Sequence, residues 1–354
     1  MKSYAIVNLY NMYNTGELMQ LLALRKALPK NDKVTLISFY SFVNKEACSN
    51  NNIEYAGKEQ PDASYIKMAI TFFSIIIQAI LFKLGISRKN NILKALHNSD
   101  IVLDMGGDTF SDNVSILYTI THSIPLLVCI IINKPYIVFS QSLGIYKTLV
   151  TKVLAKLLLK KAKLITAREN YTIEYLRDIG ISSNIIAMPD IAYLYKNSNC
   201  NNSKLYDIGI LTSSLCKKQS GITEEQNLHL LTIIAKYYSD RGYKVLLIPH
   251  VYTPARNMGA NKKLNDITMA ISIACNVDRC DIKSPGSIAS VKVVIGSRMH
   301  GCVNALNHNT PVIALSYSHK FTMLQGANEI INLKGANINS IITACNKILT
   351  EAKW

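Results

Sequence analysis

Short apolar runs bounded by turn residues alternate with longer segments of helical periodicity along this chain. The first apolar run, Tyr4–Leu9, leads into a turn-rich loop at Asn11–Gly16. A helical pattern then covers Leu18–Leu28, and a second apolar run follows at Val34–Phe39. Short continuous apolar runs indicate strands that are buried on both faces. Strands that alternate with helices predict an open parallel sheet, whose ligands bind beyond the carboxyl ends of the strands.

The same alternation continues to the end of the chain. Further strands are predicted at 101–103, 136–140, 164–166, 206–211, 244–248, 291–295 and 311–315, and further helices at 148–161, 171–179, 224–241, 266–275, 302–306 and 338–352. Residues 196–204 are polar and aperiodic, as is typical of a linker. A length of 354 residues suits two domains rather than one. We therefore predict an α/β protein with an N-terminal domain over 1–195, a C-terminal domain over 205–335 and a terminal helix over 336–354.

Two strongly apolar segments stand apart from the strands. Met68–Phe82 has only three polar breaks and is followed by Lys83 and by Arg88-Lys89. A transmembrane helix needs about 20 residues, so this segment is short for one. A buried helix and an interfacial helix flanked by positive charge both fit it. The second segment, Ser115–Ile132, predicts a core helix that is kinked or broken near Pro125.

Composition and charge narrow the class of protein. Hydrophobic residues make up 49% of the chain and charged residues 18%, which indicates well-filled cores and excludes global disorder. The net charge of +16 favours anionic partners: a phosphorylated donor, an anionic membrane surface or nucleic acid. The lysines are scattered without interleaved aromatic residues, which does not favour nucleic acid. Lys152, Lys156 and Lys160 recur every four residues on one helix face, either as a solvated face or as a membrane or acceptor contact.

The eight cysteines show no paired two-residue spacing. This pattern does not indicate a zinc ribbon or a redox pair. The first residues, Met1-Lys2-Ser3-Tyr4, do not resemble a secretory signal. We therefore expect reduced thiols in the cytoplasm, with Cys302 packed in a helix.

The candidate chemistry is concentrated in the run Gly296–Gly301. It follows the predicted strand Val291–Ile295 and opens into a helix. Unpaired backbone N–H groups at such a helix start attract anions. Arg298 adds a permanent cation, and His300 can exchange a proton near neutral pH. Together they suggest chemistry on a small phosphorylated or carboxylated donor. In the alternative interpretation, Arg298 pairs with a nearby carboxylate and His300 is a core residue.

Two earlier loops could also face ligands. Asp104–Asp112 contains Gly106 and Gly107, which let backbone approach a ligand closely, and three aspartates. The aspartates could orient sugar hydroxyls or hold a metal, although acidic loop residues are often solvated turns. Asn14-Thr15-Gly16 could contact a ligand or begin a helix.

Taken together, these motifs resemble the polysaccharide pyruvyl transferase family over roughly residues 4–330. The chain departs from the family at Ile145, where proline is frequent, and Met68–Phe82 corresponds to no shared motif. The matching pieces are Asn14-Thr15-Gly16, Asp104-Met105-Gly106-Gly107-Asp108, Gln141-Ser142-Leu143-Gly144, Ala167-Arg168-Glu169, Pro189-Asp190, Ile248-Pro249-His250, Ser297-Arg298-Met299-His300-Gly301, and Pro311–Tyr317 with Lys320.

The resemblance implies two Rossmann-like domains that face each other across a cleft, as in B-type glycosyltransferases. It also implies phosphoenolpyruvate as donor and a sugar as acceptor, joined as a cyclic pyruvate ketal. In that family, the motif matched by Arg298 and His300 binds the donor and supplies the acid/base group. The N-terminal domain would then serve the acceptor and the C-terminal domain the donor.

Each candidate residue receives an expected role. The catalytic acid/base group is His300, with His250 as second choice. Donor binding is assigned to Arg298, Ser297 and Gly301, with Arg168 and Lys320 as candidates for the donor's second anionic group. The scheme requires no metal and no cofactor besides phosphoenolpyruvate as co-substrate. Acceptor binding is assigned to Asp104, Gly106, Gly107, Asp108 and Asn14.

These assignments lead to one hypothesis and two alternatives. The hypothesis is a cytoplasmic pyruvyl transferase that acts on a sugar of a cell-surface polysaccharide precursor, for capsule or exopolysaccharide. If that acceptor is a lipid-linked oligosaccharide, the positive charge and Met68–Phe82 would help hold the enzyme at the inner membrane face. The first alternative is a nucleotide-sugar-dependent glycosyltransferase of similar architecture. The second is a non-catalytic partner at the membrane surface.

Overall fold

The computed structural model describes most of the chain and groups it into two compact units. The described residues are 1–9, 11–39, 45–57, 65–182, 184–195, 203–214, 221–251, 266–318, 320–321 and 324–352. Unit 1 comprises Met1–Met12 and Gln20–Ile191, and unit 2 comprises Tyr13–Met19 and Ala192–Trp354. The short segment Tyr13–Met19, which the sequence pattern assigned to the N-terminal domain, thus belongs to unit 2. Most of the predicted linker lies outside the described residues.

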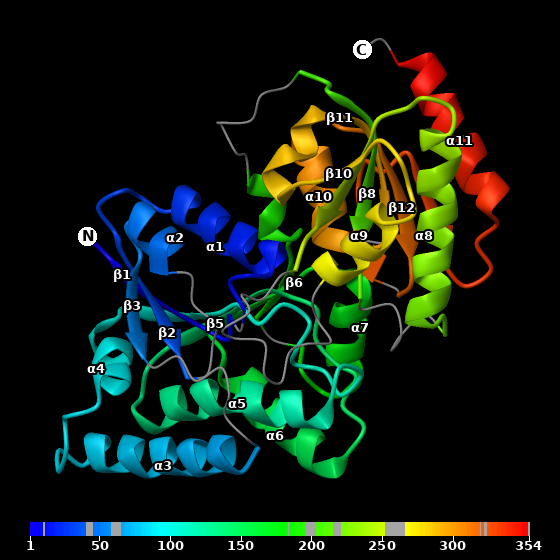
Figure 1. Ribbon diagram of the computed structural model, residues 1–354. Coiled ribbons are helices and arrows are strands. Elements are labelled where there is room, and N and C mark those ends of the chain that lie inside the picture. The colour runs from blue at the N-terminus through cyan, green and yellow to red at the C-terminus, as the bar shows by residue number, and fades with distance from the viewer. Residues whose placement is uncertain are drawn as a thin grey trace. The chain divides into compact units, whose positions relative to one another are not determined.

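Unit 1 contains a parallel sheet of seven strands in the order β3-β2-β1-β4-β5-β6-β7 (Figure 1). The order reverses between β1 and β4, so the loops after these two strands leave a common sheet edge in opposite directions. The strands are β1 Ser3–Val7, β2 Lys33–Ser38, β3 Glu54–Gly57, β4 Ile101–Asp104, β5 Tyr136–Gln141, β6 Leu164–Ala167 and β7 Ile185–Ala187.

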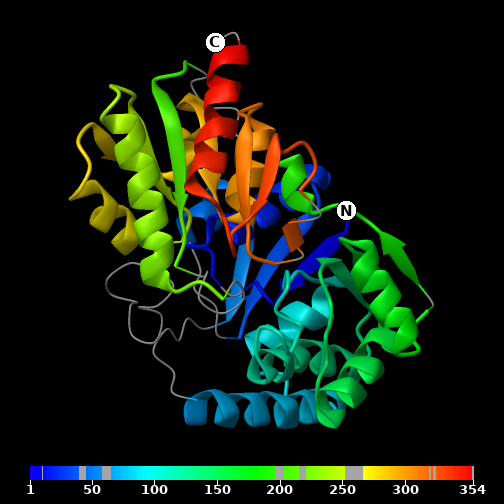
Figure 2. The same ribbon diagram turned by 90° about the vertical axis from the view of Figure 1, so that its right-hand side faces the viewer.

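Helices cover both faces of this sheet, and α5 and α6 lie on the face opposite α1 (Figures 1 and 2). Further out, α3 packs against α5, and α5 packs against α6. The helices are α1 Thr15–Ala27, α2 Lys45–Asn50, α3 Tyr65–Lys83, α4 Asn91–Asn98, α5 Ile116–Ile131, α6 Leu149–Lys161 and α7 Asn170–Asp178, followed by the short 3₁₀ helix η1 Ile191–Leu194.

The two apolar segments form α3 and α5, and the break predicted near Pro125 is absent. The helix α5 runs unbroken through Pro125, although proline lacks the N–H for the helical hydrogen bond. Leu126, Val128 and Cys129 are fully buried around it. This burial outweighs the cost of about 3 kcal/mol that an internal proline carries. In α3, Ile75, Ala79 and Phe82 are buried, whereas the opposite face is exposed.

Unit 2 contains a second parallel sheet, of six strands in the order β10-β9-β8-β11-β12-β13, which reverses between β8 and β11. Strand residues such as Ile208, Leu247 and Val293 are fully buried, as their continuous apolar runs predict. The elements are β8 Tyr206–Thr212, α8 Glu224–Ser239, β9 Val245–Pro249, α9 Asp266–Ala274, β10 Cys280–Ile282, the 3₁₀ helix η5 Pro285–Ser290, β11 Val291–Gly296, α10 Met299–Asn307, β12 Val312–Ser316, β13 Glu329–Asn332 and α11 Ile338–Glu351.

The sequence pattern did not predict the sheet-edge strands β3, β10 and β13. Each has only three or four residues. Each also carries a carboxylate, at Glu54, Asp281 and Glu329. An edge strand is paired on one side only, so it needs no continuous apolar run and gives a weak signal.

Candidate active site

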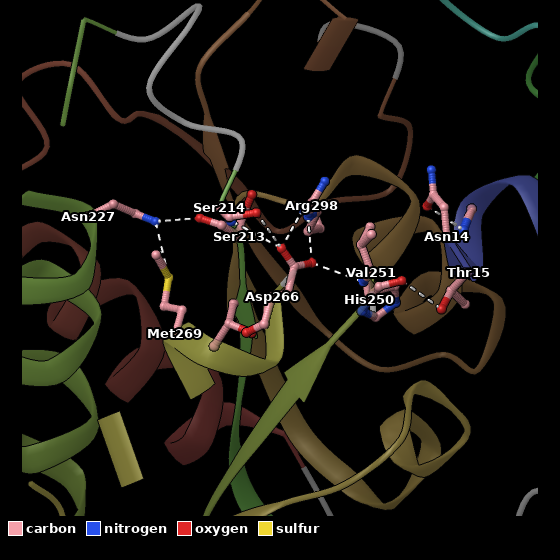
Figure 3. A network of polar contacts seen from close by, with 12 residues as sticks. Asn14, Thr15, Ser213, Ser214, Asn227, His250, Val251, Asp266, Met269 and Arg298 are labelled. Carbon is pink, nitrogen blue, oxygen red and sulfur yellow. Dashed lines mark hydrogen bonds and ion pairs between the residues drawn. The ribbon is translucent and has the colours of Figure 1, made fainter. Parts of the chain in front are cut away.

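The polar residues of unit 2 gather where β8, β9 and β11 end. Ser213 and Ser214 follow β8, His250 follows β9, and Ser297-Arg298 follows β11. Figure 3 shows these chain ends converging on Asp266, the first residue of α9. The reversal of strand order between β8 and β11 is what opens this position to polar side chains.

Asp266 joins the three strand ends through one fully buried carboxylate. Its Oδ1 accepts hydrogen bonds from the backbone N–H of Ser214 at 3.0 Å and from the Ser214 hydroxyl at 3.2 Å. Its Oδ2 accepts from the backbone N–H of Val251 at 3.0 Å and from Nε of Arg298 at 2.9 Å. Arg298 also donates from Nη2 to Oδ1. In the sequence, Asp266 is recognisable only as a helix start, because Ser214, Val251 and Arg298 are all distant from it along the chain.

Arg298 is therefore held in one orientation by a buried ion pair. Its side chain is 8% exposed, and that of Asp266 is 0% exposed. The pairing of Arg298 with a carboxylate, which was the alternative interpretation of its motif, is present. It compensates the positive charge, but a carboxylate engages only part of the five-donor guanidinium fork. Arg298 consequently acts as an oriented hydrogen-bond donor rather than as an isolated cation.

His250 is a buried, neutral imidazole. It is 1% exposed, and its Nε2 has no hydrogen-bond partner among the described residues. Its Nδ1 lies 3.5 Å from the backbone oxygen of Ile248. The pKa of His250 is lowered to about 3, mainly by burial; the contact with the Ile248 carbonyl opposes this shift, and Arg298 and His300 add to it. A side chain with this pKa carries few protons near neutrality, which favours His300 over His250 for proton transfer.

The low pKa of His250 predicts an acid-sensitive fold. In the unfolded chain a histidine takes up a proton below pH 6.5, whereas folded His250 stays neutral down to about pH 3. Its contribution to stability is complete above pH 6.5 and decreases as the pH falls from 6.5 towards 3. Between pH 7 and pH 5 we expect a loss of about 2 kcal/mol from this residue. Urea unfolding of His250→Gln at both pH values should show a smaller difference than the parent protein, and an equal difference would contradict this.

His300 lies in the first turn of α10, half-buried, beside the segment that begins α1. A Cβ atom added at Gly16 would lie 2.4 Å from Nδ1 of His300, so only glycine leaves room for the ring. The same segment is fixed to the end of β9. The backbone N–H and the hydroxyl of Thr15 both donate to the His250 carbonyl at 2.9 Å, and Asn14 forms an antiparallel bridge with Val251. Asn14, predicted as an acceptor contact of the N-terminal domain, thus lies beside the histidines of unit 2.

Gly16→Ala is expected to displace His300 while leaving the fold intact. Alanine favours a helix over glycine by about 1 kcal/mol, so thermal stability should not fall far. Transfer activity should fall at least tenfold, because small displacements of a reacting group cost large factors in rate. The control is Gly286→Ala, whose new methyl group would meet its nearest neighbour at 3.8 Å, an ordinary contact. Equal activity of the two variants would remove the proposed packing constraint on His300.

The other candidate residues of unit 2 lie in different surroundings. A Cβ at Gly301 would lie 2.8 Å from Cδ1 of Leu211 and 3.1 Å from Nε2 of His250, so this glycine leaves room for both side chains. Ser297 is 1% exposed. Lys320 places its ammonium 5.3 Å from the Tyr317 ring centroid. Burial raises the pKa of the Cys302 thiol to about 12, and its Sγ donates to the Gly296 carbonyl. Cys302 therefore has a packing role, as expected.

The candidate residues of unit 1 form a separate polar network at the ends of β4, β5 and β6. Asp104 has a fully buried side chain whose Oδ2 lies 2.8 Å from Nε2 of His122 and whose Oδ1 accepts from Asn8 at 2.8 Å. Both oxygens of Asp104, the predicted acceptor contact, thus hydrogen-bond inside the core. Gly106 packs against the His122 ring.

Arg168 also belongs to this network of unit 1. Its Nη1 lies 3.1 Å from Oδ2 of Asp190, and Gln20 donates to the same carboxylate. Its buried Nε has no hydrogen-bond partner among the described residues, and Gly107, at a φ of 67°, lies beside Nη2. Asp108 is half-buried in the same loop. Within the described ranges, no three His, Cys, Asp or Glu side chains are grouped as metal ligands.

Comparison with known proteins identifies the family. A family model described as polysaccharide pyruvyl transferase matches residues 14–319. The chain belongs to the polysaccharide pyruvyl transferase family. The match begins at Asn14 and ends beside Lys320, so it spans the site residues of both units. The amylovoran biosynthesis protein AmsJ of Erwinia amylovora is 21% identical over 251 residues, which are 64% of this chain and 58% of that protein. The chain of this pyruvyl transferase family member thus spans less than two thirds of the length of that relative.

Solved structures share the fold of this pyruvyl transferase family member at low sequence identity. MnaA of S. aureus with UDP has a TM-score of 0.59 at 14% identity, over 99% of this chain and 88% of that one. A putative UDP-N-acetylglucosamine 2-epimerase of Listeria monocytogenes has a TM-score of 0.60 at 12% identity, over 99% of this chain and 88% of that one. HepE of Anabaena with UDP and glucose has a TM-score of 0.57 at 13% identity, over 99% of this chain and 90% of that one. The predicted class, two Rossmann-like domains of B-type glycosyltransferase architecture, is confirmed.

Proposed function

We propose that this enzyme transfers the pyruvyl group of phosphoenolpyruvate to two hydroxyls of a sugar in a cell-surface polysaccharide precursor. The products would be a cyclic ketal and inorganic phosphate. The observation that carries the proposal is the cluster in unit 2, where an oriented guanidinium, a neutral imidazole and a half-buried imidazole meet at one sheet edge. The family match extends over this cluster.

Donor binding would use the Arg298 turn. Phosphoenolpyruvate carries a phosphate and a carboxylate, and each needs cationic or N–H-rich partners. Asp266 holds the guanidinium of Arg298, and α10 begins at Met299 without a side-chain cap among the described residues. The helix start and Arg298 would together hold one anionic group. Because Asp266 compensates the Arg298 charge, the second group needs another cation, and Lys320 is the candidate in unit 2.

His300 would carry the protons. A proton adds to the methylene carbon of phosphoenolpyruvate, which leaves positive charge at the carbon that bears the phosphate. A sugar hydroxyl attacks that carbon and gives up its proton, and the C–O bond to phosphate breaks, so that inorganic phosphate leaves with the electron pair. A second hydroxyl then attacks the same carbon and gives up its proton, which closes the ketal. A group that alternates between acid and base fits this sequence. Neutral His250 would hydrogen-bond through Nε2 to the donor or to an intermediate.

The acceptor would be bound by the loop after β4 in unit 1. Gly107 and Asp108 are both half-buried in this loop, whereas Asp104 and Gly106 are buried. Carboxylates and backbone groups at such a sheet edge can hydrogen-bond sugar hydroxyls. Asp104, held by His122 and Asn8, would fix the shape of the loop rather than contact the sugar.

Phosphate release from phosphoenolpyruvate in the presence of candidate acceptors tests the proposal. Mass spectrometry of the acceptor should show the addition of one pyruvate with loss of water. Thermal-shift titration separates the main alternative: stabilisation by UDP but not by phosphoenolpyruvate would favour a nucleotide-sugar-dependent glycosyltransferase. Turnover of neither donor would leave a non-catalytic partner as the better description.

A further inference from the structure

The helix α3 exposes an apolar face to solvent. Ile70, Phe73, Ile77 and Ile80 are 63%, 71%, 43% and 46% exposed. Their spacing of three and four residues places them on one side of the helix, opposite the side that packs against α5. Among the described residues, no helix combines the length and apolarity needed to span a membrane. The exposed face of α3 is therefore a surface feature that the core does not explain.

Two neighbouring helices extend this face. The first turns of α5 expose Ile116, Leu117, Tyr118 and Ile120, each between 37% and 44%. α5 packs against both α3 and α6. Soluble monomers rarely expose large contiguous apolar patches, and those that exist mark interaction sites.

The helix α6 combines exposed apolar residues with a row of lysines. Leu149, Val150, Val153 and Leu157 are 78%, 65%, 58% and 47% exposed. Of the twenty-one large hydrophobic residues exposed in the described part of the chain, fourteen lie on α3 with its following turn, on α5 or on α6. We call these fourteen residues the apolar layer. Their concentration in three adjacent helices indicates a docking surface rather than scattered exposure.

The segments that carry the apolar layer contain charged side chains of one sign only. The sequence contains no Asp or Glu from 63 to 99 or from 113 to 168, the segments that form α3, α5, α6 and their surroundings. Lys152, Lys156 and Lys160 are exposed along α6, and Arg88 and Lys89 are exposed after α3. A second copy of this chain would bring like charges together at such a surface. An anionic bilayer matches both the apolar side chains and the positive border.

We propose that α3, α5 and α6 form a monotopic membrane-binding surface that docks on anionic phospholipid. The apolar layer would enter the headgroup and acyl boundary, and the lysines of α6 would lie at the phosphate level. This interaction goes beyond the transfer reaction and does not depend on the identity of the donor.

Asp112 connects this surface to the acceptor loop of the same unit through hydrogen bonds. Its Oδ1 accepts from Thr119 of α5 at 2.7 Å, and its Oδ2 accepts from Thr151 of α6 at 2.7 Å and from the backbone N–H of Lys147 at 2.6 Å. Burial opposes the charged form, but these hydrogen bonds outweigh it and keep the pKa of Asp112 below its ordinary value. The loop that starts at Gly106 thus ends on the apolar layer, where a lipid-linked acceptor would present its sugar.

Vesicle sedimentation of the full chain tests the surface. The protein should bind vesicles of phosphatidylglycerol and phosphatidylcholine, bind pure phosphatidylcholine far less, and dissociate as salt rises. K152Q/K156Q/K160Q should lower partitioning roughly a hundredfold, at about fivefold per lysine. F73Q/I77Q should lower it by about tenfold for each side chain.

Matched variants elsewhere provide the controls. Lys26→Gln with Lys236→Gln and Lys347→Gln removes the same charge from exposed positions outside the layer, and Ile271→Gln with Ile330→Gln removes exposed isoleucines elsewhere. Partitioning that falls equally in the controls would overturn the proposal, as would absent vesicle binding. Self-association that disappears in F73Q/I77Q without vesicle binding would also overturn it. Phosphate release with a soluble acceptor should be unchanged in the layer variants, which separates this result from a failure of the proposed reaction.

Discussion

Replacing His300 with glutamine is expected to lower pyruvyl transfer by about 10²- to 10⁴-fold, the usual contribution of a general acid–base group. Glutamine keeps much of the size and hydrogen bonding of histidine but cannot exchange a proton near neutrality. The donor contacts proposed for Arg298 and the start of α10 remain. The loss should therefore appear in kcat, whereas stabilisation by phosphoenolpyruvate in a thermal-shift titration should persist.

The control is His229→Gln on α8, where the residue is exposed and lies outside the strand-end turns of the site. This variant should keep full activity. Full activity in His300→Gln would remove the acid–base role. If donor binding were lost together with kcat, His300 would instead be part of the donor-binding contacts.

Asp266→Asn is expected to destabilise the protein by about 3–5 kcal/mol, the effect of removing one partner from a buried ion pair. The variant leaves the guanidinium of Arg298 buried without its counter-charge, and it weakens the hydrogen bonds of Ser214 and Val251 to the same carboxylate. Urea unfolding measures this loss. Asp207→Asn provides the control, because the Asp207–Lys292 pair is 20% to 28% exposed and should contribute about 1 kcal/mol or less.

A double variant separates the structural effect of Asp266 from its effect on the reaction. D266L/R298M replaces both charges by apolar side chains of similar size, which should recover much of the lost stability. It should not recover activity, because the oriented guanidinium is gone. Recovery of both would show that the ion pair serves the fold alone. A stability loss in Asp266→Asn no larger than in Asp207→Asn would show that the pair is not the buried hub that its geometry indicates.

The sequence by itself determined the alternation of strands and helices and the loops that carry the chemistry. Continuous apolar runs such as Val291–Ile295 marked central strands, because a strand buried on both faces needs no polar positions. Parallel connectivity then places the loops after β4, β9 and β11 at carboxyl sheet edges. For that reason His250, Arg298 and His300 could be selected without coordinates. The order of these motifs along the chain was also enough to identify the family.

Only the tertiary structure decided which of these residues meet and which are buried. Asp266 lies 32 positions from Arg298 along the chain. Gly16 follows β1, whereas His300 follows β11. No local sequence pattern therefore indicates either contact. Asp104 looks like a ligand-facing loop residue in sequence, yet His122 and Asn8 enclose it. Helical periodicity likewise could not tell which apolar faces of α3, α5 and α6 are covered. Burial and ion pairing depend on neighbours brought together by the fold, whereas strand and helix patterns depend on neighbours along the chain.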